Sequence, residues 1–441
     1  MSADKNLNEM SPLELDAYKY EHRYDEAEAL MGKEAADALR KLIDFYGKDW
    51  IDWLASLYDA GTGSFYYSNS ARDNDGFLPD SESTCQAHSM MSFMGLLNVY
   101  GGDYIKAYPK QTQENCLKFI REMQSDVDGY FYHSQWGTKI GSARKGRDLS
   151  QCIELIERFG GTPKYRTPME RLSAAESTDN DKSVLPAHLL SKEAMKKYLD
   201  ELDVNRRSHE FGHIVSSQNM QIKAAGLAEF VCDYINERQY ADTGLWEVGA
   251  NYSTLSGVIK VGATLGGLGS YVHYGDKIVD SAMDVIMSDA NPEYINYVFN
   301  PWGAFGAAIA GASRTEKMAK EQGITVDFSV ADIRKKIYAR LPELVDKTIE
   351  KLKKFQKPDG SFSYEQHRSA PTTQGVPVSL GVYEGDVNGL ACAMFYPLHS
   401  IFPLLGLQKV QMCNHDDFLR LRNKIVEAHK AYNKEHSKGD K

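Results

Sequence analysis

Long apolar runs are missing from this 441-residue chain, which has no uncharged apolar stretch of about 18 residues. Its first residues, MSADKNLNEMSPLELDAYKY, lack the basic segment followed by an apolar segment that marks a secretory signal. We therefore expect neither a membrane span nor export, and we predict a cytoplasmic protein.

Cysteine is also scarce, and no two cysteines form a CxxC pair. Most of them stand beside apolar residues at helical spacing, which favours small core residues in a reducing compartment over disulfides or a metal cluster. The six are Cys85, Cys116, Cys152, Cys232, Cys392 and Cys413.

An excess of positive charge is missing as well. The chain has 51 Lys and Arg against 61 Asp and Glu, and its basic residues are dispersed. Binding of a phosphate backbone needs a clustered basic surface, so nucleic acid is not expected as a partner. With 42% hydrophobic and 25% charged residues, the chain has the composition of a globular protein. We expect a small-molecule or oligosaccharide substrate and no membrane partner, and the oligomeric state stays open.

What the chain does contain is a recurring turn, in which a helix ends at Asp and Gly and an aromatic residue follows. The four segments are WLASLYDAGTGSFYY, FIREMQSDVDGYFYH, FVCDYINERQYADTGLWE and LKKFQKPDGSFSY. Their glycines, Gly63, Gly129, Gly244 and Gly360, are 66, 115 and 116 residues apart, which corresponds to units of about 58 residues. We predict that each glycine adopts the left-handed conformation that stops a helix and that each aromatic fills the gap between neighbouring hairpins.

Two kinds of helix alternate along the chain. Apolar, small-residue-rich helices are expected to begin near Ser83, Asp148, Ser208, Ser253, Pro301 and Asp386, all residue types that suit a helix start. Amphipathic, charge-rich helices are expected at 28–57, 110–124, 192–202, 223–237, 277–288 and 330–354.

An inner ring of the first kind and an outer ring of the second predict an all-α fold, an (α/α)6-type toroid that forms a double ring of helical hairpins. We expect one domain over 1–441, with a lead-in at 1–27 and a C-terminal helix at 414–441. A linear solenoid such as a HEAT array fits less well, because its repeats lack the Asp-Gly-aromatic turn.

The segments QKPDGSFSY, QSDVDGYF and EGDVNGLACA resemble the repeats of the terpenoid cyclase and protein prenyltransferase superfamily, over roughly residues 50–405. Members of that superfamily carry Gln, then Asp-Gly and an aromatic, at this hairpin position, so the resemblance implies the toroid. Class II cyclases protonate their substrate with a DxDD motif, and prenyltransferases hold zinc with an Asp-x-Cys pair and a distant His. The chain contains neither motif. A cyclase-like or prenyltransferase-like activity is therefore an alternative and not the main prediction.

In a toroid, the first turns of the inner helices and the loops before them line the mouth of the central cavity. The residues expected there are rich in carboxylates, amides, histidines and aromatics, which suit a sugar better than a hydrocarbon. Helical toroids also serve uronate lyases, unsaturated glucuronyl hydrolases and sugar 2-epimerases. We therefore predict a carbohydrate-active enzyme, a lyase or hydrolase of a uronate-containing sugar.

Two mechanisms are open. In a lyase, Arg147 or Asn251 would neutralise the carboxylate, a neutral histidine would take the proton, and Tyr252 would protonate the leaving oxygen. In a hydrolase, two carboxylates drawn from Asp80, Asp148 and Asp386 would act as acid and base. The catalytic candidates are His209, His213, Tyr252, Asp386 and Asp148. The substrate-binding candidates are Glu82, Gln86, His88, Arg147, Asn251, Trp302, Glu384 and Asn388.

The segment His209-Glu210-Phe211-Gly212-His213 fits the zinc motif HExxH, and Glu229 stands where gluzincin peptidases have their third ligand. The helix that follows is polar, and no edge strand for a peptide substrate precedes it. We therefore predict no metal or other cofactor and keep a zinc site of His209, His213 and Glu229 as an alternative. A non-catalytic binding toroid is a further alternative.

Overall fold

The computed structural model describes residues 7–94, 98–101, 103–168, 170–171, 186–323, 329–407 and 410–436, and it is mostly helical. Strands within these ranges form two short antiparallel ribbons, β1 (Tyr58–Asp59) with β2 (Ser64–Phe65) and β3 (Thr372–Thr373) with β4 (Val376–Pro377). No helix of the described ranges has the length and apolar character needed to cross a membrane.

All six helices expected for an inner ring are present. They are α6 (Ser81–Phe93), α8 (Ser142–Arg158), α11 (Ser208–Ser216), α14 (Tyr252–Leu268), α16 (Asn296–Gln322), and α18 (Val387–Leu390), which continues through the π-helical turn η5 (Ala391–Phe395) into α19 (Tyr396–Leu404). The side chains of Asp80, Asn251 and Asp386 cap α6, α14 and α18 by accepting backbone N–H groups. Asp148 and Pro301 lie inside α8 and α16, so the expected starts of these two helices were wrong.

Four expected outer helices are α7 (Lys110–Glu122), α10 (Lys192–Leu202), α15 (Gly275–Met287) and α17 (Val330–Leu352). The helix expected at 223–237 is broken at Gly226, whose φ is 70°, and only α13 (Ala228–Asn236) continues from there. The expected helix at 28–57 is broken into α2 (Asp25–Met31), α3 (Lys33–Phe45) and α4 (Trp50–Ser56). The breaks fall at Gly32 and Gly47, whose φ angles of 85° and 60° are left-handed and end a helix. The remaining helical elements are η1 (Leu7–Glu9), α1 (Pro12–Glu21), α5 (Asn69–Arg72), η2 (Tyr104–Ala107), η4 (Ala187–Leu189), α12 (Asn219–Ala224) and α20 (His415–His436).

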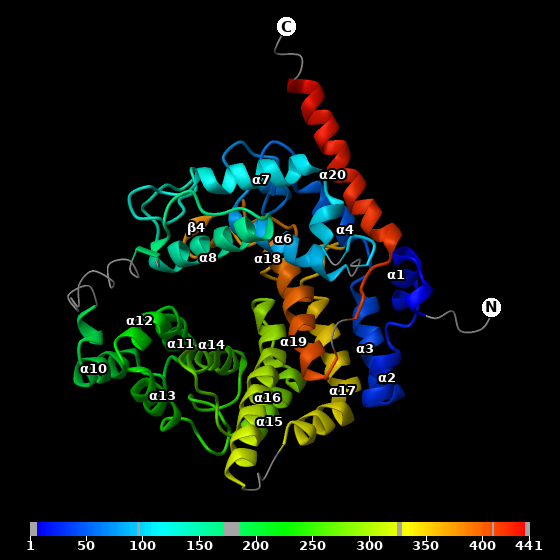
Figure 1. The fold of residues 1–441 in the computed structure, drawn as a ribbon. Helices are drawn as coiled ribbons and strands as arrows, with labels where there is room; N and C mark the ends of the chain where they lie inside the picture. The colour runs from blue at the N-terminus through cyan, green and yellow to red at the C-terminus, as the bar shows by residue number, and fades with distance from the viewer. Residues whose placement is uncertain are drawn as a thin grey trace.

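Except between α8 and α11, helices of the inner set pack on their neighbours in chain order. Helix α6 contacts α8, α11 contacts α14, α14 contacts α16, and α16 contacts α19, while α18 and η5 pack back against α6 (Figure 1). In the outer set, α17 packs on α15 on one side and on α3 on the other. Helices from the two ends of the sequence therefore lie side by side.

The four turn glycines are all left-handed, as predicted, with φ between 69° and 80°. Each turn presses on a segment remote from it in the sequence, where a Cβ on the glycine would clash. Such a Cβ would lie 2.5 Å from the Thr112 oxygen at Gly63, 2.2 Å from the Arg166 oxygen at Gly129, 2.8 Å from the Ile278 nitrogen at Gly244, and 2.7 Å from the Trp50 nitrogen at Gly360. The aromatics Phe65, Phe131, Trp246 and Phe362 behind these turns are buried.

Glutamines before two of the turns link each turn to the next segment. Gln124 donates to the Gly129 and Tyr165 carbonyls at 3.2 and 2.9 Å and accepts from the Tyr165 N–H at 2.8 Å. Gln239 repeats the pattern with Gly244 and His273, at 2.8, 2.9 and 3.0 Å. A buried amide that satisfies three backbone groups explains why glutamine recurs at this position.

Helix α20 holds the first hairpin. The Tyr58 hydroxyl lies 2.8 Å from His429 Nε2 and donates to Thr112 Oγ1 at 3.1 Å, and the same His429 nitrogen is 2.8 Å from Thr112 Oγ1. Arg420 forms an ion pair with Asp52 on α4. The six cysteines are free and buried, in agreement with the core role expected for them.

Candidate functional site

Arg147 on α8 interacts with polar groups of five other elements of the inner set. Its side chain is one-third exposed and donates to Glu82 on α6. Its positive charge opposes the burial that raises the pKa of Cys392 of η5 and of Tyr396 of α19. It also lowers the pKa of His213 on α11 and of Lys260 on α14. Residues that are remote in the sequence thus share one electrostatic environment, which we call the Arg147 cluster.

A buried ion network is joined to the cluster through Glu82. Arg144, one turn before Asp148 on α8, is fully buried and donates to both oxygens of Asp148 at 2.7 and 3.0 Å. Its remaining N–H group reaches Glu82 Oε2 and Thr373 Oγ1, both at 2.8 Å. Asp148 also accepts from Ser81 at 3.0 Å. A bidentate arginine fixes a carboxylate strongly, so Asp148 serves as an anchor for α8.

Sequence reasoning missed Arg144. Arg144 and Asp148 are four residues apart, the spacing at which two helical side chains meet, and this was the available signal. Its other partner, Thr373, lies in the β3–β4 ribbon more than two hundred residues away, as the 229-residue separation records. The network therefore ties that ribbon to α6 and α8.

The carboxylates of Asp80 and Asp386 are used as helix caps. Asp80 accepts from the backbone and hydroxyl of Ser83 at 3.0 and 2.8 Å, and its burial raises its pKa against the opposing charge of Arg144. Asp386 accepts N–H groups of Gly389, Tyr364 and Ala370 at 2.6, 2.8 and 3.2 Å. Burial nevertheless raises the pKa of Asp386 to about 6. With Asp148 held by Arg144, each of the three carboxylates is thus engaged by hydrogen bonds within the protein.

An amide pair borders the cluster. Gln86 on α6 is buried and donates through Nε2 to Asn388 Oδ1 on α18 at 2.9 Å. Its Oε1 atom is buried without a hydrogen-bond partner in the described part of the chain. The π-helical turn η5 follows Asn388, and such turns are frequent at functional sites. Four of the predicted substrate-binding residues, Glu82, Gln86, Arg147 and Asn388, are therefore brought together.

The two histidines of HEFGH lie one turn apart on α11, and burial lowers the pKa of each, with a smaller effect from Lys260. The side chain of His209 is solvent-exposed, yet enough protein surrounds it to lower its pKa, as expected of a residue in a concave surface. Both rings are therefore neutral near pH 7 and able to accept a proton.

Lys260 was also missed, although it is the single charged residue of α14. Its pKa is lowered by burial and then by the charge of Arg147. Within the described ranges, its ammonium group has no carboxylate partner. A half-buried cation without an anion, in a chain of net charge −10, leaves room for an anionic ligand.

The zinc alternative is not assembled in the described part of the chain, where no three His, Cys, Asp or Glu side chains are arranged to hold a metal ion. Glu229 lies exposed on α13, and Glu210 pairs with Arg207 at 3.4 Å. The charges that act on these histidines are instead those of Lys260, which lowers the pKa of both, and of Arg147, which lowers the pKa of His213.

Two aromatic candidates have other partners. His88 is buried against Phe65 and Phe159, and burial lowers its pKa to about 3. The Tyr252 hydroxyl donates to the Ala290 carbonyl at 2.8 Å, and its ring stacks on Tyr297. Both side chains are thus engaged by residues outside the Arg147 cluster.

Three further candidates have structural contacts. Trp302 is fully buried and donates to Thr348 Oγ1 on α17 at 3.1 Å, so it joins α16 to the outer layer. Asn251 is exposed and caps α14 through the Ser253 and Thr254 N–H groups. Glu384 accepts from the Ser70 N–H at 2.8 Å and from the Ser369 hydroxyl at 2.9 Å, which fastens the loop that carries β3 and β4.

No protein-family model matches this chain, and no curated protein or solved structure does either. The resemblance to terpenoid cyclases and prenyltransferases therefore stays a prediction. Function has to be inferred from the side chains of the site itself.

Proposed function

We propose that the hairpins close into an (α/α)6 toroid around a central hollow. Support comes from contacts between the two ends of the sequence, where the Gly360 turn presses on Trp50 and α17 packs on α3. The return of α18 and η5 to α6 adds to it. An open solenoid would leave its first and last hairpins apart.

In this hollow the chain acts as a carbohydrate-active enzyme, a lyase of a uronate-containing sugar. The observation that carries the proposal is the gathering of two cations, Arg147 and Lys260, beside the neutral imidazoles of His209 and His213. Elimination next to a carboxylate needs a cation to offset the negative charge that develops and a neutral base to take the proton. The cytoplasmic location expected from the sequence belongs to this proposal.

The roles follow from position. Arg147 and Lys260 bind the uronate carboxylate, and His213 takes the proton from the carbon beside it. The electron pair forms a double bond to the neighbouring carbon, whose bond to the glycosidic oxygen breaks. Tyr396 supplies the proton to that oxygen in place of Tyr252, because it lies beside Gln86 and Arg147 and burial raises its pKa, which keeps the hydroxyl protonated.

A hydrolase is less well supported, because Asp80, Asp148 and Asp386 are bound to backbone, serine or arginine donors. A cyclase-like or prenyltransferase-like enzyme, a zinc peptidase and a non-catalytic binding toroid remain as outcomes that the test distinguishes.

The test offers the protein a panel of pectic, alginate and glycosaminoglycan oligosaccharides and follows the absorbance of the unsaturated uronate product. We expect turnover by the wild type and a loss of at least about a hundredfold in Arg147→Gln and His213→Gln. The control variants Arg206→Gln and His367→Gln change exposed residues outside the cluster and should keep wild-type rates.

New reducing ends without absorbance would favour a hydrolase. Turnover of a polyprenyl diphosphate alone would favour the terpenoid branch. Stoichiometric zinc that is lost in His213→Ala would favour the peptidase, and the absence of any turnover would leave a binding toroid.

A further inference from the structure

The glycine of the HEFGH segment lies against Lys260 of α14. A Cβ on Gly212 would come 2.5 Å from the Lys260 carbonyl carbon, 2.6 Å from the Val261 nitrogen and 2.7 Å from the Lys260 Cβ atom. The first two of these atoms belong to the backbone, which cannot turn aside as the end of a flexible side chain can. A residue without a side chain is therefore what allows α14 to lie this close to α11.

A buried hydroxyl group holds this contact in place. Thr264 Oγ1 lies 3.1 Å from the Gly212 carbonyl oxygen and 3.1 Å from the Lys260 carbonyl oxygen. Nearer the start of α14, a Cβ on Gly257 would lie 1.8 Å from Ser208 Oγ, so a second glycine brings the same two helices together. The position of α14 along α11 is thus fixed at two points.

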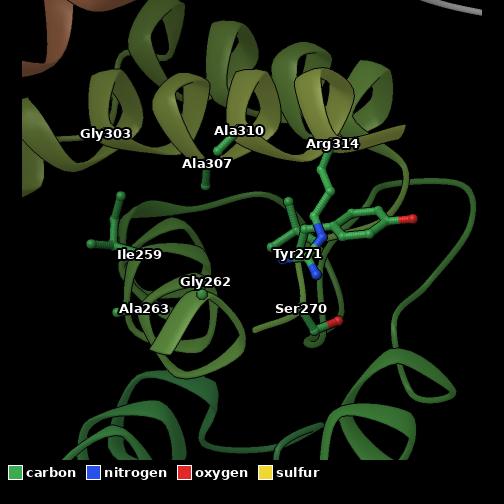
Figure 2. Close-up of a pocket in the computed structure, with 11 residues that line it drawn as sticks. Ile259, Gly262, Ala263, Ser270, Tyr271, Gly303, Ala307, Ala310 and Arg314 are labelled. Carbon is green, nitrogen blue, oxygen red and sulfur yellow. The ribbon is translucent and has the colours of Figure 1, made fainter. Parts of the chain in front are cut away.

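Lys260 begins on the side of α14 that faces α11. Figure 2 shows the other side of this helix, where Ile259, Gly262 and Ala263 border a groove of about 400 Å³ against Ala307 of α16. Lys260 lies outside the lining of this groove. The neighbour that matters for the Lys260 side chain is therefore α11, which carries the two histidines.

The contact at Gly212 brings the Lys260 side chain close to both histidines of the segment. Gly212 directly precedes His213 and follows His209 by three residues, the spacing of neighbours on a helix surface. Of the charged groups that lower the pKa of these two imidazoles, Lys260 has the largest effect on each. Packing and electrostatics thus agree that the ammonium group lies beside the histidine pair.

We infer that Gly212 is a positioning residue of the uronate site: by leaving room for α14, it places the Lys260 ammonium beside His213, so that a carboxylate bound by Lys260 lies next to the base. This inference rests on the proposed function, which assigns the carboxylate to Lys260 and the proton transfer to His213. Gly212 has no side chain to offer a substrate, so its effect should pass entirely through Lys260.

Titration with methyl β-glucuronide and methyl β-galacturonide, each compared with the uncharged methyl glycoside of the parent sugar, tests the inference. These probes have a free hydroxyl where an eliminated sugar would be attached, so a lyase does not consume them. Ligand-observed NMR measures the affinities. The wild type should bind one or both uronides at least about tenfold more tightly than the uncharged counterpart, as expected of a hydrogen bond between charged groups.

Gly212→Ala and Lys260→Met should each reduce this preference about tenfold, while the affinity for the uncharged glycosides stays within about twofold. Adding Gly212→Ala to Lys260→Met should reduce the preference no further, because the glycine acts through the lysine. Gly311→Ala is the matched control: its Cβ would lie 2.6 Å from the Val272 carbonyl oxygen, an equally tight backbone contact that involves α16 instead of α11. It should keep the wild-type preference.

Circular dichroism checks that each variant folds. Thr264→Val loosens the contact between Gly212 and Lys260 without adding a side chain to it, because it removes the hydroxyl group near both carbonyl oxygens. It should reduce the preference about threefold, and it serves as the test if Gly212→Ala does not fold.

A preference that survives Gly212→Ala, or Thr264→Val where the first variant does not fold, would overturn the inference and leave the proposed function standing. So would an equal loss in Gly311→Ala, or a double variant that loses more than Lys260→Met alone. Equal binding of charged and uncharged glycosides by the wild type, or a preference that survives Lys260→Met, would overturn the carboxylate site and the inference with it. If no probe binds, both proposals fail.

Discussion

Gly360→Ala tests whether the last Asp-Gly turn braces the first hairpin. The new methyl group would lie 2.7 Å from the Trp50 nitrogen and from the Asp49 Cβ atom, at a φ of 80°. The left-handed conformation costs alanine about 1 kcal/mol. Forcing the turn away from α4 adds about 2 kcal/mol, as in other overpacked sites, so we expect a loss of about 3 kcal/mol in the free energy of unfolding.

Gly375→Ala is the matched control, because Gly375 has a φ of 83° and no atom within 4 Å of the added Cβ. It should cost only the conformational part, about 1 kcal/mol. Urea unfolding followed by circular dichroism measures both. For a chain of 441 residues the entropy of unfolding is about 0.9 kcal/mol/K, so thermal midpoints should fall by about 3 and 1 °C. Equal losses would refute the contact between the turn and α4, and with it the main support for ring closure.

Three further predictions concern buried charge, all measured as free energies of unfolding in urea. Burial raises the pKa of Asp386 to about 6, so the folded state resists ionisation of this carboxyl. As the pH rises from 4 to 6, the free energy of unfolding of the wild type should therefore fall by about 3 kcal/mol, and Asp386→Asn should remove that slope. Burial lowers the pKa of His88 to about 3, so stability should fall by about 2 kcal/mol between pH 6.5 and 5, and His88→Phe should abolish that decline. A wild type and variant with parallel pH profiles would contradict either statement. Arg144→Gln should cost about 3–5 kcal/mol, because it leaves Asp148 buried without a cation and removes one of the two cations that pair with Glu82, whereas Arg147→Gln should cost about 1 kcal/mol; similar costs would contradict the distinction.

The parts of the fold that could be predicted are those specified locally. An Asp-Gly-aromatic segment determines its own turn, because only glycine adopts the left-handed conformation cheaply, and Gly63, Gly129, Gly244 and Gly360 all do so. Amphipathic spacing likewise gave α10 at its observed bounds. The break at Gly32 was missed, because the apolar spacing continues across it and only the backbone conformation interrupts the helix.

Site residues were harder to predict, because the direction of a side chain around a helix depends on packing. Tyr252 and Trp302 stand close to the expected helix starts, yet they point towards Ala290 and Thr348 in the outer layer and its loops. Lys260 was overlooked because its neighbours are apolar, although a single charge on such a helix is itself a signal. Thr373 could not be placed from its sequence position, because it reaches the cluster on a ribbon that belongs to the final hairpin.

The hydrogen bonds between His429 of α20 and the first hairpin can form only late in synthesis. Tyr58 and Thr112 are synthesised early, but the imidazole that joins them, His429, leaves the ribosome 371 residues after Tyr58. At about 5–20 residues per second, the first hairpin waits tens of seconds for this imidazole. A ribosome stalled before α20 would therefore hold a chain whose first hairpin still lacks its contact with His429.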